Sequence, residues 1–330
     1  MEISTPRECS KHSKHGVRAC RGAREDASHN SDSTVLHCIL QEKRGITLAT
    51  ALKTSIIILI LAAAPAAHAG SFATEVISSS GLVPGHEDAS TVLGSPTLTL
   101  YDPWANSFQG ADVDTSMVYG AWTADKVANL SPSGEVTVRF DSPVTNDPLH
   151  YYGADFMIFG NAAFTGADPN VWVDFDTDMA SYIINESGSA FGLDTMSVSV
   201  SQDGNTWHTF AGPTAGGYWP TQAFGAWDAN AGAWDHNSVS DFTKPMLPSL
   251  TPGQFGGLSV VDALALYNGS GGGTAFDIGE LGLDWVEYVK VEGPGVIDGF
   301  SKVSVVPEPA TMAILLIGGA GLFIRHRRRK

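Results

Sequence analysis

Short segments of alternating or continuously apolar residues recur between residues 70 and 306, separated by clusters of Gly, Pro, Asn and Asp. In one of them Val136, Val138 and Phe140 alternate with polar residues, so these three side chains share one face of a strand. The 3.6-residue period of a helix is nearly absent. The pattern predicts an all-β body, an antiparallel β-sandwich of jelly-roll type with long loops.

Nine strands are expected in this body, and three local features add detail. Asp203-Gly204 tolerates the positive φ of a tight turn and predicts a hairpin. Residues 155–159 lack alternation, as is typical of a central strand that is buried on both faces. Residues 211–257, rich in Gly, Pro and Trp, are expected to form long loops. The predicted strands are 72–78, 97–101, 135–141, 155–159, 196–201, 206–210, 258–267, 285–292 and 300–305.

Residues 53–69 have the pattern of a secretory signal peptide. Lys53 precedes the apolar run 56–64, and Ala67-His68-Ala69 forms a small-x-small site, so we expect a signal helix with cleavage after Ala69. Residues 1–52 are rich in charged and polar residues without periodic apolar positions. They are expected to be disordered, or to precede the true start of translation.

Three features follow one another at the other end of the chain. A proline-containing motif precedes an uncharged run, predicted as an apolar helix, which is shorter than the roughly 20 residues that span a bilayer comfortably. A basic tail follows, which the positive-inside rule holds on the cytoplasmic side. These features are the motif Val306, Pro307, Glu308 and Pro309, the run 310–324, and the basic residues Arg325, Arg327, Arg328, Arg329 and Lys330.

In this order they resemble the PEP-CTERM sorting signal of Gram-negative bacteria, which is read by a membrane exosortase. The resemblance implies cleavage near Pro307 and release or attachment at the cell surface. The signal-like segment predicts export by the general secretory machinery to the cell envelope surface or extracellular matrix, and the short uncharged run predicts a transient inner-membrane anchor. The alternative is an ordinary tail anchor, which needs no Pro-Glu-Pro and is usually longer. The chain is thus expected to divide into an extension (1–52), a signal peptide (53–69), a body (70–305) and a sorting signal (306–330).

Cysteine and charge are distributed unevenly along the chain. All three cysteines, Cys9, Cys20 and Cys38, precede the signal-like segment, which excludes a disulfide framework for the body. Residues 70–306 contain 28 Asp and Glu against five Lys and Arg, a net charge of −23. Such a surface repels nucleic acid and anionic lipid, so divalent cations or neutral glycans are the more plausible partners.

Five segments of the body also resemble one family of bacterial cell-surface proteins of unassigned biochemistry. This resemblance implies a cell-surface β-sandwich, and it brings no catalytic motif to transfer. The segments are 92–96, 134–143, 155–164, 198–210 and 276–291.

Two groups of residues are candidate binding sites. Asp174, Asp176 and Asp178 stand at alternate positions, as in the first part of many calcium loops, although Met179 replaces the usual Gly and Asn185 stands where an EF-hand has Glu. Calcium is the one cofactor expected, and the alternative is a solvated acidic loop. The second group lies in a Gly-rich stretch and is typical of a neutral-glycan site or of a cap on the sandwich: Tyr218, Trp219, Trp227 and Trp234.

No catalytic residue is predicted. The body has no Gly-x-Ser-x-Gly elbow, and its four His residues (His86, His150, His208 and His236) show no zinc-binding spacing. We expect an exported, non-catalytic module for adhesion, matrix or polysaccharide binding. The competing hypothesis is a secreted polysaccharide hydrolase that uses paired carboxylates. A third is a purely structural surface coat with neither ligand nor activity.

Overall fold

The computed structural model describes residues 70–306 except 169, 172, 175, 213 and 216–218. The predictions for 1–52, for the signal helix 53–69, and for Pro307, Glu308, Pro309, the apolar helix 310–324 and the basic tail lie outside the described residues. Within the described part of the chain, no helix is long and apolar enough to cross a membrane.

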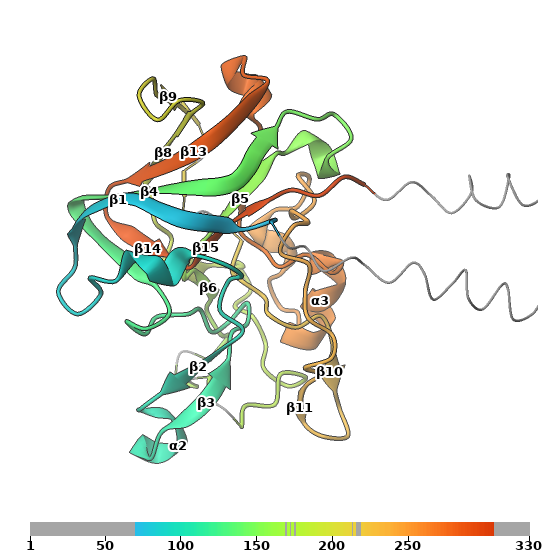
Figure 1. Cartoon of the computed structure of the whole chain (residues 1–330). Helices are drawn as coiled ribbons and strands as arrows, with labels where there is room; N and C mark the ends of the chain where they lie inside the picture. The colour runs from blue at the N-terminus through green and yellow to red at the C-terminus, as the bar shows by residue number, and fades with distance from the viewer. Residues whose placement is uncertain are drawn as a thin grey trace, which may run out of the picture. The chain divides into compact units, whose positions relative to one another are not determined.

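The larger sheet is antiparallel and has the strand order β1-β4-β13-β8-β9, with β14 paired to β4 as well (Figure 1). Its centre is the pairing of β4 with β13, in which Val136 lies opposite Val291 and Val138 opposite Val289. All four valines are fully buried, so this register points one face of the sheet into the core. The strands are β1 (Ala73–Leu82), β4 (Ala128–Thr145), β8 (Ser197–Ser201), β9 (His208–Thr209), β13 (Trp285–Glu292) and β14 (Gly295–Ile297).

A second antiparallel sheet has the order β12-β5-β15, formed by β12 (Thr274–Phe276), β5 (Phe156–Phe159) and β15 (Gly299–Lys302). Every residue of β5 is buried, which confirms the prediction of a central strand covered on both faces. Phe156 stacks on Phe276 of the neighbouring strand, with ring centroids 4.9 Å apart.

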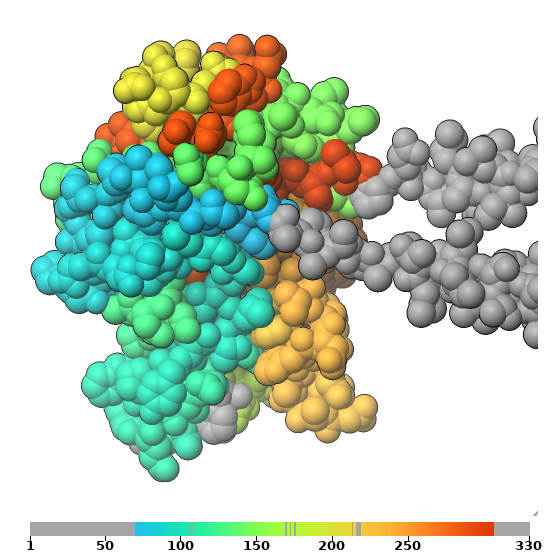
Figure 2. Space-filling model, in the orientation of Figure 1, coloured from blue at the N-terminus to red at the C-terminus, as the bar shows by residue number. Residues whose placement is uncertain are grey.

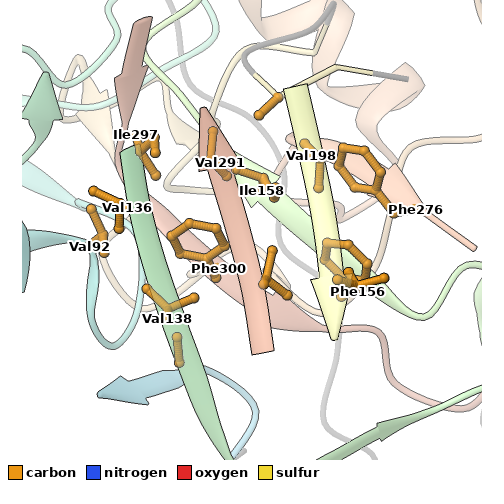
Figure 3. Packing of buried hydrophobic residues seen from close by; sticks show 14 of the residues in the cluster. Val92, Val136, Val138, Phe156, Ile158, Val198, Phe276, Val291, Ile297 and Phe300 are labelled. Carbon is orange, nitrogen blue, oxygen red and sulfur yellow. The ribbon is translucent and has the colours of Figure 1, made fainter. Parts of the chain in front are cut away.

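Both sheets contribute side chains to one buried cluster. Figure 3 shows the cluster from close by, with valines of the larger sheet beside aromatic residues of the smaller one. The prediction of an all-β, antiparallel body is therefore confirmed, and the jelly-roll sandwich stays a prediction. Members of the cluster include Val136, Val138, Val198 and Val291 from the larger sheet and Phe156, Ile158, Phe276 and Phe300 from the smaller.

A second cluster lies under the loops and contains Met117, Phe164, Phe255 and Tyr267. Figure 2 shows the cyan surface of β2, β3 and α2 and the gold surface around β10 and β11 on the same side of the body, away from the yellow surface of β8 and β9. The elements here are β2 (Thr99–Asp102), α2 (Ala105–Phe108), β3 (Ala111–Asp114), β6 (Ala163–Phe164), β7 (Ala190–Phe191), β10 (Trp227–Asp228), β11 (Ala233–Trp234) and α3 (Val260–Tyr267). Short 3₁₀ turns occur at Ala89–Val92, Tyr151–Gly153, Pro252–Gln254 and Ile278–Leu281.

The predicted strand 258–267 is wrong, because Val260–Tyr267 forms the helix α3. Ser259 caps its first turn by accepting a hydrogen bond from the N–H of Asp262 (3.1 Å). Asn268, with a φ of 49°, ends it in the left-handed region. The buried residues Val260, Ala263 and Tyr267 follow a helical spacing, so the apolar run packs as a helix face rather than a strand.

The predicted hairpin at Asp203-Gly204 is confirmed. β8 and β9 pair with Ser199 opposite Thr209, and Gly204 has a φ of 74°. The backbone N–H groups of Thr206 and Asn205 donate to the Asp203 carboxylate and lower its pKa to about 2.

The two ends of the described chain lie beside one another. Phe72 forms a β-bridge with Ser301, and the N–H of Lys302 donates to the carbonyl of Ser71 (2.7 Å). The backbone pairing continues to Val306, whose N–H donates to the carbonyl of Leu149 (2.8 Å). The folded body therefore extends to the first residue of the Val-Pro-Glu-Pro motif.

Asp298, between β14 and β15, is a buried carboxyl that holds the segment before β2. It accepts hydrogen bonds from the backbone N–H of Thr97 (3.1 and 3.2 Å) and from its hydroxyl (2.6 Å). Burial raises the pKa of Asp298 from 3.8 to about 6, although the bonds from Thr97 act in the opposite direction.

Replacing Asp298 with Asn tests this assignment. A carboxyl whose pKa is raised by folding binds its proton more tightly in the folded state, so its stabilising contribution falls as the pH rises from about 4 to about 6. The free energy of unfolding of Asp298→Asn, relative to wild type, should therefore rise across this window, by on the order of 3 kcal/mol. Urea unfolding from about pH 4 to about pH 7 measures the difference, and a difference independent of pH would contradict the assignment.

Candidate functional site

The three described tryptophans of the predicted glycan group lie at the second cluster. Trp227 and Trp234 are cross-strand partners in the β10–β11 hairpin, with ring centroids 5.3 Å apart and edge-to-face geometry. Trp234 is buried, and Trp219 packs against Phe255 at 5.5 Å. These contacts place the three rings among the apolar residues of the second cluster, and the glycan group stays a prediction; Tyr218 lies outside the described residues.

The carboxylates of the predicted calcium loop hydrogen-bond to the chain. Asp174 accepts from the backbone N–H of Asn106 (3.2 Å), and Asp178 accepts from that of Ala180 (3.0 Å). Asp176 is exposed. Across the described residues, no group of three or more His, Cys, Asp or Glu side chains is arranged to hold a metal ion. Calcium binding stays a prediction, and titration with Ca²⁺ would test it.

A recess of about 650 Å³ is the candidate functional site. Its walls come from two parts of the chain, the turn before Trp122 and the β6–β7 region, which meet through a hydrogen bond from the N–H of Phe164 to the carbonyl of Met117 (2.8 Å). Both aromatic and polar side chains line the recess. The lining includes five aromatic residues (Tyr119, Trp122, Phe164, Tyr182 and Phe191) and the polar residues Asn161, Thr165, Asp168 and Asn185.

A tight turn places Tyr119 at this recess. Ser116 and Tyr119 pair through two backbone hydrogen bonds of 2.9 Å, and Met117 and Val118 between them are buried. The turn therefore anchors its apolar residues in the second cluster and leaves Tyr119 half-buried at the recess.

Two hydrogen bonds in series orient the indole of Trp122. Its Nε1–H donates to the hydroxyl of Tyr119 (3.0 Å), which in turn donates to the carboxylate of Asp102 on β2 (2.6 Å). Burial and the bond to Asp102 raise the pKa of Tyr119 above its ordinary value, so the hydroxyl remains a donor. Trp122 is 36% exposed, which leaves part of its ring available to a ligand.

Two glycines allow the walls to approach closely. A Cβ at Gly120 would lie 2.3 Å from the carbonyl oxygen of Asn161, and one at Gly166 would lie 2.4 Å from the hydroxyl of Tyr182. Neither position accommodates a larger residue without moving its neighbour.

A second recess, of about 460 Å³, has a different chemistry. Trp219 and Tyr152 line it together with two acidic residues, Asp277 and Glu280. Asp277 caps the 3₁₀ turn Ile278–Leu281 by accepting from the N–H of Gly279 (2.7 Å). Among the described residues of the predicted glycan group, Trp219 lines this recess and none lines the larger one.

The aromatic residues of the larger recess are not among those that the sequence predicts to bind a ligand. Tyr119 and Trp122 are separated from Tyr182 and Phe191 by the whole of β4 and β5, so no local pattern joins them. A short-range signal exists only for Tyr119 and Trp122, which stand three residues apart beside Gly120.

Comparison with known proteins identifies the sorting signal. Residues 305–329 match the family model of the PEP-CTERM protein-sorting motif, which confirms the resemblance seen in the sequence. The protein thus falls in the class of exported proteins that an exosortase sorts to the cell envelope or surface. A comparison with curated proteins finds no match to the chain, and the family of the body stays a prediction.

Replacing Tyr119 with Phe tests the orientation of Trp122. The change removes one hydrogen bond to Asp102 and one from Trp122, so the free energy of unfolding should fall by about 1–2 kcal/mol. Tyr101→Phe is the matched control, because Tyr101 is exposed, and it should change stability by less than about 0.5 kcal/mol. Equal stability of the two variants in urea unfolding would contradict the proposed series of bonds.

Proposed function

We propose that the body is a non-catalytic β-sandwich module that binds a neutral glycan and holds the protein in the extracellular polysaccharide matrix. The observation that carries this proposal is the recess at Tyr119 and Trp122, where exposed aromatic rings stand beside amide, hydroxyl and carboxylate groups. Aromatic rings pack against the apolar face of a sugar, and polar groups form hydrogen bonds with its hydroxyls.

Three properties of this recess favour a glycan. Trp122 and Phe191, 36% and 54% exposed, offer ring surface to a ligand without unfolding. The bond to Tyr119 restricts the Trp122 ring before binding, which lowers the entropy cost of association. Asp168 and Asn185 supply acceptors and donors at the same recess.

The charge of the body favours a neutral polymer over an anionic one. With 28 Asp and Glu against five Lys and Arg in residues 70–306, a polyanion would be repelled at long range. The sorting signal supports a destination where polysaccharide is abundant, reached through the general secretory machinery and the exosortase, with the run 310–324 as a transient inner-membrane anchor.

The smaller recess favours a second candidate, a secreted polysaccharide hydrolase. Asp277 and Glu280 line it together with Trp219, and most glycoside hydrolases use a pair of Asp or Glu residues. The two candidate functions use different recesses, so substitutions in the lining of each recess distinguish them.

Trp122→Ala is expected to weaken binding of the host exopolysaccharide or its neutral oligosaccharides by about tenfold or more, because it removes an oriented stacking surface. Trp285→Ala is the matched control, because Trp285 lies on β13 outside the recess and is similarly exposed, at 37% against 36%. Isothermal titration measures both. Equal affinities of the two variants would contradict the site, and release of reducing ends that Glu280→Gln abolishes would support the hydrolase instead.

Mass spectrometry of the protein from its native host tests the sorting signal. The mature form should lack the basic residues Arg325 to Lys330, because the exosortase separates them from the body. Replacing both Glu308 and Pro309 with Ala should preserve the body and leave the tail attached. A wild-type mature form that retains residues 325–330 would refute processing.

A further inference from the structure

Four large apolar side chains are exposed at the edge where the described chain ends. Leu149 is 67% exposed, Tyr152 44%, Val305 51% and Val306 46%. Three of these residues belong to one backbone ladder, because His150 forms a β-bridge with Val305 and the N–H of Val306 donates to the carbonyl of Leu149. We call these four residues the exit edge.

Hydrogen bonds make the exit edge part of the fold. The N–H of Val303 donates to the carbonyl of Asp155 (2.8 Å), and that of Tyr151 donates to the carbonyl of Ser304 (3.2 Å). Asp155 is fully buried, and its carboxylate lies 2.9 Å from Nδ1 of His150. The apolar side chains therefore lie on two segments that hydrogen bonds hold against each other and against β5.

Tyr152 has an unusual backbone for its exposed position. Its φ is 60°, in the left-handed region that residues other than glycine rarely adopt. The ring remains 44% exposed, and its nearest aromatic contact is Tyr151, at a centroid distance of 6.0 Å. Such strain is characteristic of functional surfaces, and tyrosine is enriched where proteins meet the bilayer interface.

The chain beyond Val306 indicates what covers this edge. Only Pro307, Glu308 and Pro309 separate it from the uncharged run 310–324. Three residues reach at most about 11 Å, even when fully extended. When the run lies in the bilayer, as the proposed transient anchoring requires, the exit edge stands next to the lipid headgroups.

The charges near this edge are of both signs. Lys244 Nζ lies 5.5 Å from the Tyr151 ring centroid, Lys302 Nζ lies 3.4 Å from the Asp141 carboxylate, and Asp147 accepts from the N–H of Leu149 (2.9 Å). An anionic bilayer would still repel the body, so the exposed apolar side chains suit a zwitterionic surface.

We propose that the exit edge is a lipid-docking surface that seats the body on a zwitterionic bilayer while the sorting signal is still attached. Leu149, Val305 and Val306 enter the interface, and Tyr152 lies at headgroup level. The inference rests on the transient membrane anchoring proposed above, and it does not require the glycan site.

A labelling experiment on the full chain tests the docking. With Cys9, Cys20 and Cys38 replaced by Ser, Leu149→Cys and the control Asn205→Cys each carry one environment-sensitive fluorophore. Asn205 is exposed in the β8–β9 turn, and Figure 1 shows this turn well separated from the end of β15. Each protein is reconstituted into phosphatidylcholine vesicles that contain a headgroup-labelled quencher lipid.

We expect the label at position 149 to lose most of its fluorescence to the quencher and the label at position 205 to lose little. Equal quenching at both positions would overturn the docking. Adding Tyr152→Ser and Val305→Ser to the protein labelled at position 149 should reduce the quenching, and unchanged quenching would also overturn the docking. The vesicles contain no exosortase. If the exit edge contacts only that enzyme, the label at position 149 will not be quenched, and this result would also overturn the proposal. Glycan titration of the same proteins reports separately on the larger recess, so failure of either proposal is distinguishable.

Discussion

The pairing of β4 with β13 is the interaction on which the rest of the structure depends. No cysteine occurs in residues 70–306, so the body has no disulfide and its stability comes from burial. In this register Val136 and Val138 of β4 face the same way as Val289 and Val291 of β13, toward the aromatic residues of the smaller sheet. A slip of one residue would turn these valines to solvent.

Both surfaces with proposed functions are attached to this scaffold. The larger recess forms where the turn at Tyr119 meets the β6–β7 sheet over the second cluster. Asp102 on β2 accepts the hydrogen bond of the Tyr119 hydroxyl, which in turn orients Trp122. The exit edge forms because β15 pairs with β5 and the following residues continue the ladder to Val306. The larger recess and the exit edge share no residue, whereas Tyr152 of the exit edge also lines the smaller recess.

Local sequence patterns predicted much of the body and one end of the chain. The strand 285–292 coincides with β13, and the Asp203-Gly204 hairpin and the central strand β5 are as expected. The segment 258–267 was assigned wrongly, because a short apolar run fits a buried strand and a helix face equally well. The Ser259 cap and the packing of Tyr267 into the second cluster resolve that ambiguity.

The destination of the protein can be read from the linear chain, because the sorting signal is contiguous and residues 305–329 match it. The alternation of apolar and polar residues likewise shows which face of a strand is buried, since successive side chains point to opposite sides of the sheet. The binding surfaces cannot be read in this way. Trp122 meets Tyr182 and Phe191, and Leu149 meets Val306, only after distant strands pair in register, because the distance between such side chains depends on the packing of the whole body.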